Sequence, residues 1–338
     1  MIPVVDQRQT AHTFVLRPTP PFRLDLTAWA LRRRPRNLID RWDGTTYRRV
    51  IIVEGRPTEL AVRQTGSSAA PRLRVTATPP PQTLLERRRV RSIADRLLGL
   101  RIDLTDWYRM AASDGRLRPL ADTFRGMKPP RFPTVFEALV NAFACQQLSL
   151  EVGLELLNRL ATISSVRLGR RGDVRYAFPT AQDIARLPAE KYRAIGFSRQ
   201  KVRALLDLAR PITRQELELE SLAREDDAVV RQRLLELRGV GRWTAEYVLL
   251  RGVGRLHVFP GDDVGAQKRL ARWLGRSRPL DYAGVHRAVE RWQPYAGLVY
   301  FHLLLDGLSQ AGALDRDPES TSNGSIIDAS RPSRLGSR

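Results

Sequence analysis

The chain has 338 residues, enough for two or three domains that each bury a core of their own. It carries 57 Lys and Arg against 36 Asp and Glu, a formal charge of +21 at pH 7, which favours a polyanionic partner such as nucleic acid over a small-metabolite substrate. The single cysteine, Cys145, excludes an internal disulfide framework, a cysteine-bound iron–sulfur cluster and a cysteine-based zinc finger. No apolar run reaches the roughly 18 residues of a membrane span, and the first residues carry no secretory signal, so we expect a cytoplasmic protein that does not bind membranes.

The amino-terminal region is predicted to be an α+β domain. Apolar residues at helical spacing predict a helix over Leu24–Arg34, which Pro35 ends. Turn residues at 54–57 separate two strand runs and predict a hairpin. Strands are predicted at residues 47–53, 58–64 and 73–78. Three prolines at 79–81 break the chain, so we place the end of this domain at residue 85.

From residue 83 onward the pattern turns helical, and residues 86–313 are predicted to form a nearly all-α region. Thr134 is a predicted N-cap, and Glu137 three residues later would complete a capping box. Residues 314–338, rich in Ser, Arg, Asp and Pro, are predicted to be a disordered tail. Helices are predicted at residues 84–98, 106–112, 119–124, 136–146, 150–162, 181–187, 198–209, 227–237, 242–252, 264–274, 282–292 and 295–311.

One helix–turn–helix segment stands out. Residues 234–250, with the sequence LLELRGVGRWTAEYVLL, predict a helix, a tight Gly-x-Gly turn and a second helix. Gly239 and Gly241 permit backbone angles that are closed to other residues and leave the backbone bare. The free N–H groups at the start of the second helix favour a phosphate, so the turn is able to grip a DNA backbone without reading its sequence. A plain corner between two helices is the alternative.

Two adjacent carboxylates follow about 20 residues later. The segment VFPGDDVG, residues 258–265, presents Asp262 and Asp263 after a Pro-Gly loop, at the start of the next predicted helix. A single Asp in such a place is usually an N-cap, and a second one exceeds what capping requires.

The hairpin, its second helix, the Pro-Gly loop and the Asp closely resemble the helix-hairpin-helix DNA glycosylase superfamily, and in particular its alkylation-repair branch, the 3-methyladenine DNA glycosylase II family. Residues 136–149 resemble the central helix of the family and the Gln-Gln/Leu-x-Ser turn after it. The opening from Pro21 to Gly44 is similar to the amino-terminal domain of the bacterial long form, a small sheet-and-helix unit like half of the TATA-binding protein. The resemblance covers residues 15–312 or so. It implies two helical lobes with an active-site cleft between them.

The resemblance implies a monofunctional DNA glycosylase that flips out alkylated purines of the 3-methyladenine or 7-methylguanine type and leaves an abasic site, in base excision repair. Asp263 matches the catalytic Asp, whose carboxylate would stabilise positive charge on the sugar as the glycosidic bond breaks. Asp262 is the second candidate, with capping or loop support as its simpler role. A purine alkylated at N3 or N7 is already cationic, so it leaves without a proton and one carboxylate suffices.

Three aromatic residues are candidates for the base pocket. Trp243 and Tyr247 lie four residues apart on the second hairpin helix and share a face, so their rings could stack on a cationic purine. Tyr295 stands where the family has another pocket aromatic. Core packing is the alternative for all three. Bifunctional members of the superfamily carry a Lys at the position of Trp243, so we expect no lyase activity.

The resemblance also assigns contacts to DNA. Gln147, with Leu148 beside it, matches the side chain that fills the space left by the flipped base, and capping of the helix end is the alternative. The expected DNA-binding residues are Gly239, Gly241, Arg242, Thr244, Gln147, Leu148 and Ser149. In relatives the hairpin carbonyls hold Na⁺ or K⁺, and the matching carbonyls belong to Leu235, Leu237 and Val240. No other cofactor is expected.

Two other functions stay open on the sequence alone. The chain could be a non-catalytic DNA-binding protein that kept the hairpin, or a glycosylase for deaminated bases such as hypoxanthine. A carboxylate presented by a loop near two aromatic residues favours the enzyme, because backbone binding does not need it. The expected partner is double-stranded DNA that contains alkylated bases, bound by a monomer.

Overall fold

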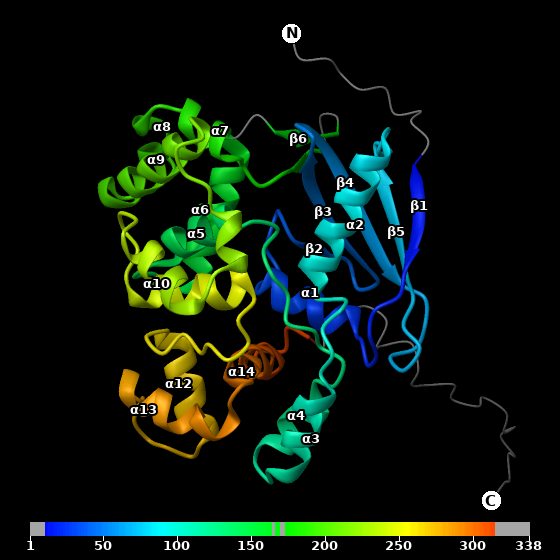
Figure 1. Ribbon diagram of the computed structural model, residues 1–338, viewed down its shortest axis with the longest axis vertical. Helices are drawn as coiled ribbons and strands as arrows, with labels where there is room; N and C mark the ends of the chain where they lie inside the picture. Colours follow the sequence, from blue (N-terminus) through cyan, green and yellow to red (C-terminus); the bar gives the residue numbers. More distant parts are fainter. Residues whose placement is uncertain (1–10, 164–165, 170–172, 315–338) are drawn as a thin grey trace, which may run out of the picture.

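The computed structural model describes residues 11–163, 166–169 and 173–314. A sheet-and-helix unit, blue and cyan in Figure 1, lies beside a larger helical region drawn from green to red. Within these residues we find no helix with the length and apolar character that crossing a membrane requires. Residues 315–338 lie outside the described part, so the prediction of a disordered tail stays a prediction.

The sheet contains five antiparallel strands in the order β1-β5-β4-β3-β2. They are β1 (His12–Leu16), β2 (Arg41–Trp42), β3 (Thr46–Val53), β4 (Arg56–Gln64) and β5 (Leu73–Thr78). The predicted hairpin is confirmed as β3 and β4, and alternation along β5 buries Leu73, Val75 and Ala77. Sequence analysis missed β1 and β2, which lie at the two edges of the sheet.

Two helices, α1 (Leu24–Arg32) and α2 (Leu84–Leu98), cover the sheet. A complete capping box of Thr83 and Glu86 starts α2, and Val90, Ala94 and Leu97 belong to the hydrophobic core of the sheet. The sheet-and-helix unit therefore extends past the predicted boundary at residue 85 and includes all of α2.

The helical region has two hydrophobic cores. One is formed mainly by the helices between residues 135 and 248. The other is formed by the helices at 105–123 and 264–310 together with the outer face of α1. We call the two parts of the helical region that enclose these cores the two helical lobes. A short pair of strands, β6 (Arg167–Leu168) and β7 (Arg175–Tyr176), precedes α7. The helices are α3 (Thr105–Ser113), α4 (Leu117–Thr123), α5 (Val135–Cys145), α6 (Leu150–Ile163), α7 (Ala181–Arg186), α8 (Ala189–Ala194), α9 (Arg199–Thr213), α10 (Asp227–Leu235), α11 (Arg242–Val248), α12 (Val264–Trp273), α13 (Tyr282–Val289) and α14 (Ala296–Gln310). Short 3₁₀ turns lie at Glu220–Arg224 and Glu290–Trp292.

The second hairpin helix is shorter than predicted as an α-helix. α11 ends at Val248, and a π-helical turn over Leu249–Val253 continues it. Such widened turns are rare and are found often at functional sites.

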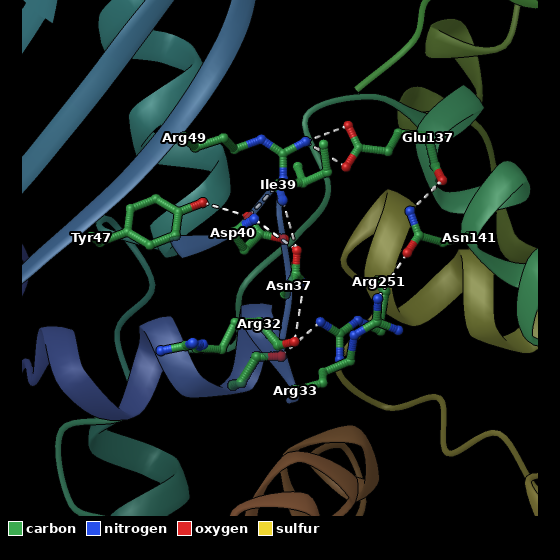
Figure 2. A network of polar contacts seen from close by, with 11 residues as sticks. Arg32, Arg33, Asn37, Ile39, Asp40, Tyr47, Arg49, Glu137, Asn141 and Arg251 are labelled. Carbon is green, nitrogen blue, oxygen red and sulfur yellow. Dashed lines mark hydrogen bonds and ion pairs between the residues drawn. The ribbon is translucent and has the colours of Figure 1, made fainter. Parts of the chain in front are cut away.

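A buried ion-pair network joins the sheet to the helical region. Thr134 is the N-cap of α5, as predicted, and its Oγ1 accepts a hydrogen bond from the Glu137 amide at 3.0 Å. In the described structure Glu137 does not complete the capping box, because both of its carboxylate oxygens accept from Arg49 on β3 (Figure 2). Arg49 also donates to Asp40 at 2.7 Å, and Asp40 accepts from the Tyr47 hydroxyl at 2.7 Å.

Burial acts on both carboxyl groups of this network. It raises the pKa of Glu137, although Arg49 opposes the change. Burial also pulls the pKa of Asp40 upward, but the charge of Arg49 and the hydrogen bond from Tyr47 outweigh it and lower that pKa. The positive charge of Arg49 thus compensates the negative charges of two buried carboxylates.

Replacing Arg49 with Met should lower the free energy of unfolding by about 3–5 kcal/mol, because Asp40 and Glu137 would be left without their cation. Arg48→Met on the same strand is the control, since Arg48 is half-exposed and its Nε lies 3.6 Å from Oδ2 of the half-exposed Asp43. The control should cost less than about 1 kcal/mol in urea unfolding. Equal losses of unfolding free energy in the two variants would contradict the structural role of the network.

Candidate active site

A cavity of about 990 Å³ lies between the two helical lobes. Its wall combines the turn after α5, the hairpin, the first turn of α12, one face of α14 and the end of α1. Residues in this wall include Arg33, Arg34, Gln147, Leu148, Ser149, Gly239, Gly241, Arg242, Trp243, Thr244, Tyr247, Asp262, Asp263, Lys268, Arg269 and Tyr300. Most of the predicted site residues are therefore in one place.

Asp263 is both a helix cap and a residue of the cavity wall. It is the N-cap of α12, and its Oδ1 accepts a hydrogen bond from the Ala266 amide at 2.8 Å. Its Oδ2 accepts from the hydroxyl of Tyr300 on α14 at 3.1 Å. The simpler N-cap interpretation is thus correct, but capping occupies one oxygen and leaves the carboxylate at the cavity wall.

Tyr300 is a partner of Asp263 that sequence analysis missed. Burial and the neighbouring charge of Asp263 raise the pKa of Tyr300 well above its ordinary value, so the phenol keeps the proton that it donates. The sequence showed only an aromatic residue within an apolar helix, a pattern typical of core packing.

Asp262 is engaged differently from its neighbour. Its two oxygens accept from Nε and Nη2 of Arg242 at 2.6 and 3.0 Å, and the Arg242 guanidinium lies 3.7 Å from the centre of the Tyr282 ring. This pair ties the start of α11 to the Pro-Gly loop. Asp262 supports the loop, as its simpler interpretation predicted.

Glu246, on α11, anchors the Pro-Gly loop. Its side chain is 1% exposed and accepts from the Gly261 amide at 3.0 Å and from the Tyr282 hydroxyl at 2.7 Å. A Cβ on Gly261 would lie only 2.8 Å from the Tyr282 ring, so this position requires glycine. The hairpin helix thus positions the loop that carries Asp263.

The aromatic pair is assembled as predicted, whereas Tyr295 is not part of it. The ring centres of Trp243 and Tyr247 lie 5.4 Å apart at an interplanar angle of 30°, and both residues line the cavity. The prediction for Tyr295 is wrong: it lies outside the cavity wall and packs edge-on against Trp107, 6.2 Å away. Tyr295 precedes the first turn of α14, and Tyr300 on that helix reaches the cavity instead.

The hairpin and the turn after α5 are bound to each other. Gln146 donates from Nε2 to the Gly239 carbonyl and to Thr244 Oγ1, both at 2.8 Å. This contact leaves the next residue, Gln147, exposed in the left-handed conformation with φ +55°, beside the 43% exposed Leu148. The structure therefore places both candidate wedge residues at the cavity rim. Thr244, by contrast, is buried, and its hydroxyl holds the turn.

The predicted cation carbonyls lie where α10 ends. Helix α10 stops at Leu235, and the Leu237 carbonyl accepts a 3₁₀-type hydrogen bond from the Val240 amide at 3.1 Å. Carbonyls at a helix end carry partial negative charge that suits a monovalent cation, which stays a prediction. In the described part of the chain, no group of three or more His, Cys, Asp or Glu side chains could hold a metal.

Glu246→Gln should lower the free energy of unfolding by about 1–3 kcal/mol, because a buried acceptor oxygen becomes an amide donor that faces other donors. Glu236→Gln is the matched control, since Glu236 is exposed on the same hairpin and should change stability by less than about 0.5 kcal/mol. Chemical unfolding measures both. An unchanged stability of the Glu246 variant would show that this residue does not hold the loop.

Comparison with known proteins agrees with this geometry. Residues 140–294 match the family described as HhH-GPD superfamily base excision DNA repair protein. A DNA-3-methyladenine glycosylase of Bacillus subtilis is 29% identical over 205 residues, which are 60% of this chain and 68% of that protein. DNA-3-methyladenine glycosylase 2 of Escherichia coli is 27% identical over 190 residues, 56% of this chain and 64% of that protein.

A solved structure extends the match to the sheet. The 3-methyladenine DNA-glycosylase from Archaeoglobus fulgidus has a TM-score of 0.75 and 25% identity, and the match covers 86% of this chain and 97% of that one. The amino-terminal sheet followed by a mostly helical region is thus a known arrangement. Over residues 140–294 the chain thus matches the HhH-GPD superfamily of base excision DNA repair proteins, and it is similar in sequence and in fold to DNA-3-methyladenine glycosylases.

Proposed function

We propose that the protein is a monofunctional DNA glycosylase that flips out alkylated purines of the 3-methyladenine or 7-methylguanine type and hydrolyses their N-glycosidic bond. One observation carries the proposal: the Asp263 carboxylate lines the same cavity as the Trp243 and Tyr247 rings. The names of its relatives support the substrate class. A protein that only binds DNA needs the hairpin but not this carboxylate.

The chemistry follows from the charges. As the bond between C1′ and the base nitrogen breaks, its electron pair leaves with the base and positive charge builds on the sugar. The fixed carboxylate of Asp263 stabilises that charge and orients a water molecule, whose oxygen joins C1′ while its proton is lost to the carboxylate or to solvent. A cationic methylpurine becomes neutral as it leaves, so the site needs no second acid.

The other residues of the cavity wall are suited to contacts with a distorted DNA duplex. A base must leave the helix to reach Asp263, at a cost of a few kcal/mol. Gln147 and Leu148, exposed at the rim, are placed to fill the space that it vacates. Lys268 and Arg269 in the middle of α12 and the bare hairpin amides face the same cavity and suit phosphates. We propose that a monomer binds double-stranded DNA in this way, with Na⁺ or K⁺ at the hairpin carbonyls.

The proposal includes the absence of lyase activity. Strand cleavage by this superfamily needs a lysine amine that forms a Schiff base with the sugar, and Trp243 occupies the matching position. Lys268 is the lysine in the cavity wall, and it is exposed on α12. The expected product is therefore a free base and an unbroken abasic strand.

Asp263→Asn should lower single-turnover release of 3-methyladenine and 7-methylguanine from methylated duplex DNA by at least ~100-fold, because a neutral amide cannot stabilise the cationic sugar. The variant should still bind DNA that contains an abasic site. Asp262→Asn is the matched neighbour, and loss of its exposed pair with Arg242 should cost no more than about 1 kcal/mol, or about fivefold in rate.

Chromatography of the released bases and denaturing gels of the strand measure the outcome. Full activity of the Asp263 variant would overturn the catalytic assignment. A wild-type protein that binds DNA and releases no base would favour the non-catalytic alternative, and a cut strand would contradict the monofunctional assignment.

A further inference from the structure

One side of the amino-terminal sheet carries a patch of arginines. Along β4 and β5, Val62, Leu73 and Val75 belong to the core beneath α1 and α2, so the residues between them point to the other side of the sheet. We call that side the open face. Its arginines lie on these strands or directly beside β1 and β5, and all are exposed: Arg17, Arg63, Arg72 and Arg74.

Two of these arginines lie directly opposite each other on neighbouring strands. Arg63 on β4 is the partner of Arg74 on β5. The Cβ atoms of such partners are roughly 5 Å apart, and like charges at that distance repel each other. The next residues in the same row, Val15 on β1 and Thr46 on β3, supply no counter-charge. This pairing is unfavourable in the free protein and becomes favourable when an anion binds across it.

The sequence around the patch contains no carboxylate that could offset it. Residues 12–24 and 60–78 contain no Asp or Glu. Within the described residues the four arginines form no ion pair, whereas exposed arginines elsewhere do, as Arg101 does with Asp95 at 2.7 Å. The acidic residue of β4, Glu59, is buried and already bound to two other arginines. The positive charge of the open face is therefore available to a partner.

The open face is separated from the cavity between the helical lobes. Helix α1 contributes Ala28 and Leu31 to the core of the sheet, and Trp29 and Ala30 on its outer side to a core of the helical region. Figure 1 shows α1 with the sheet on one side and α14 on the other. A duplex in the cavity thus has α1 and the sheet itself between it and the open face, and DNA on that face is a different stretch.

We propose that the open face binds the sugar–phosphate backbone of a second stretch of duplex DNA without reading its sequence. Guanidinium groups bind phosphate oxygens through paired N–H donors. The next row of the same face places Thr13 opposite Thr76, with their hydroxyl oxygens 3.2 Å apart, and hydroxyl groups also bind phosphates. The inference goes beyond the proposed function, because it requires a duplex as partner but no excision of a base.

Duplex DNA suits the patch better than an acidic peptide does. A duplex carries one negative charge for every ~1.7 Å of its axis, so several arginines on a rigid sheet contact phosphates at once. The hairpin of the same chain is also suited to a DNA backbone, so the two surfaces would share one kind of partner. A protein held by one stretch of DNA at its sheet remains close to DNA while its cavity samples another.

Binding of a second duplex to an already occupied protein tests the proposal. One equivalent of an unlabelled short duplex with an abasic site fills the cavity. A fluorescent undamaged duplex is then titrated in, and its anisotropy is measured at several salt concentrations. Wild type should bind the labelled duplex, and the logarithm of its affinity should fall linearly with the logarithm of the salt concentration.

The double variant Arg63→Thr, Arg74→Thr should bind the labelled duplex ~10-fold or more weakly at ~0.1 M salt. The slope of the salt dependence should decrease by about 1 for each arginine removed. Threonine is favourable in strands, and the change removes two opposed charges, so stability in urea should be equal or higher. Release of 7-methylguanine from a short duplex should be unchanged, because the cavity wall keeps all of its residues.

The matched control is Arg87→Gln, Arg88→Gln. It removes the same two charges from exposed positions on α2, on the other side of the sheet. Affinity for the labelled duplex should stay within ~2-fold of wild type, because salt screens charges at that distance. An equal loss in this control would mean that net charge alone holds the duplex, and it would overturn the proposal.

Unchanged affinity and slope in the Arg63 and Arg74 double variant would also overturn the proposal. If that variant does not fold, Arg17→Thr with Arg72→Thr makes the same comparison on the same face. Polyglutamate that displaces the labelled duplex at a lower concentration of charge would assign the face to acidic proteins and contradict DNA as its partner. Binding of the second duplex by a wild-type protein that releases no base would support this inference and contradict the proposed function alone.

Discussion

The carboxylate of Asp263 must meet two demands at once. One oxygen caps α12 through the Ala266 amide, and the other accepts from Tyr300 on α14, while the group as a whole lines the cavity. A side chain held at both oxygens loses little freedom when a substrate arrives, so in the function we propose its charge would already be in place for the cationic transition state. The loop that carries Asp263 is held as well. Glu246 anchors the loop at Gly261 from the hairpin helix, and Asp262 ties the loop to Arg242.

The two helical lobes and the sheet unit meet around this carboxylate. The hairpin belongs to one lobe and α12 to the other, so the cavity exists only where the lobes face each other. The amino-terminal unit does more than support them, since Arg33 and Arg34 line the cavity. Arg49 fixes that unit to α5 through Glu137, four residues before the Asn141 that holds Arg33. The charge near the base pocket thus depends on the packing of two parts of the fold.

Local signals predicted much of this architecture from the sequence. Helix α2 and strand β5 have the predicted bounds, because helical spacing of apolar residues and strict alternation are patterns of neighbouring residues. The hairpin and the Asp263 loop were found through spacing. Long-range contacts determine the rest. Glu137 binds a cation 88 residues away instead of completing the capping box. Which of Tyr295 and Tyr300 reaches the cavity depends on the direction of α14, which the sequence does not show. Arg33 stands in a run of basic residues that gives no sign of its burial, and its hydrogen-bond partners Asn141 and Tyr247 lie 108 and 214 residues further along the chain.

The central claim is that the Asp263 carboxylate faces the sugar of an extruded nucleotide and stabilises its positive charge. Affinity for two duplexes tests it directly, one with a cationic pyrrolidine in place of the deoxyribose ring and one with the neutral tetrahydrofuran analogue. We expect wild type to bind the cationic analogue on the order of 100-fold more tightly, and Asp263→Asn to abolish the difference. Equal affinity of the wild-type protein for the two duplexes would contradict it.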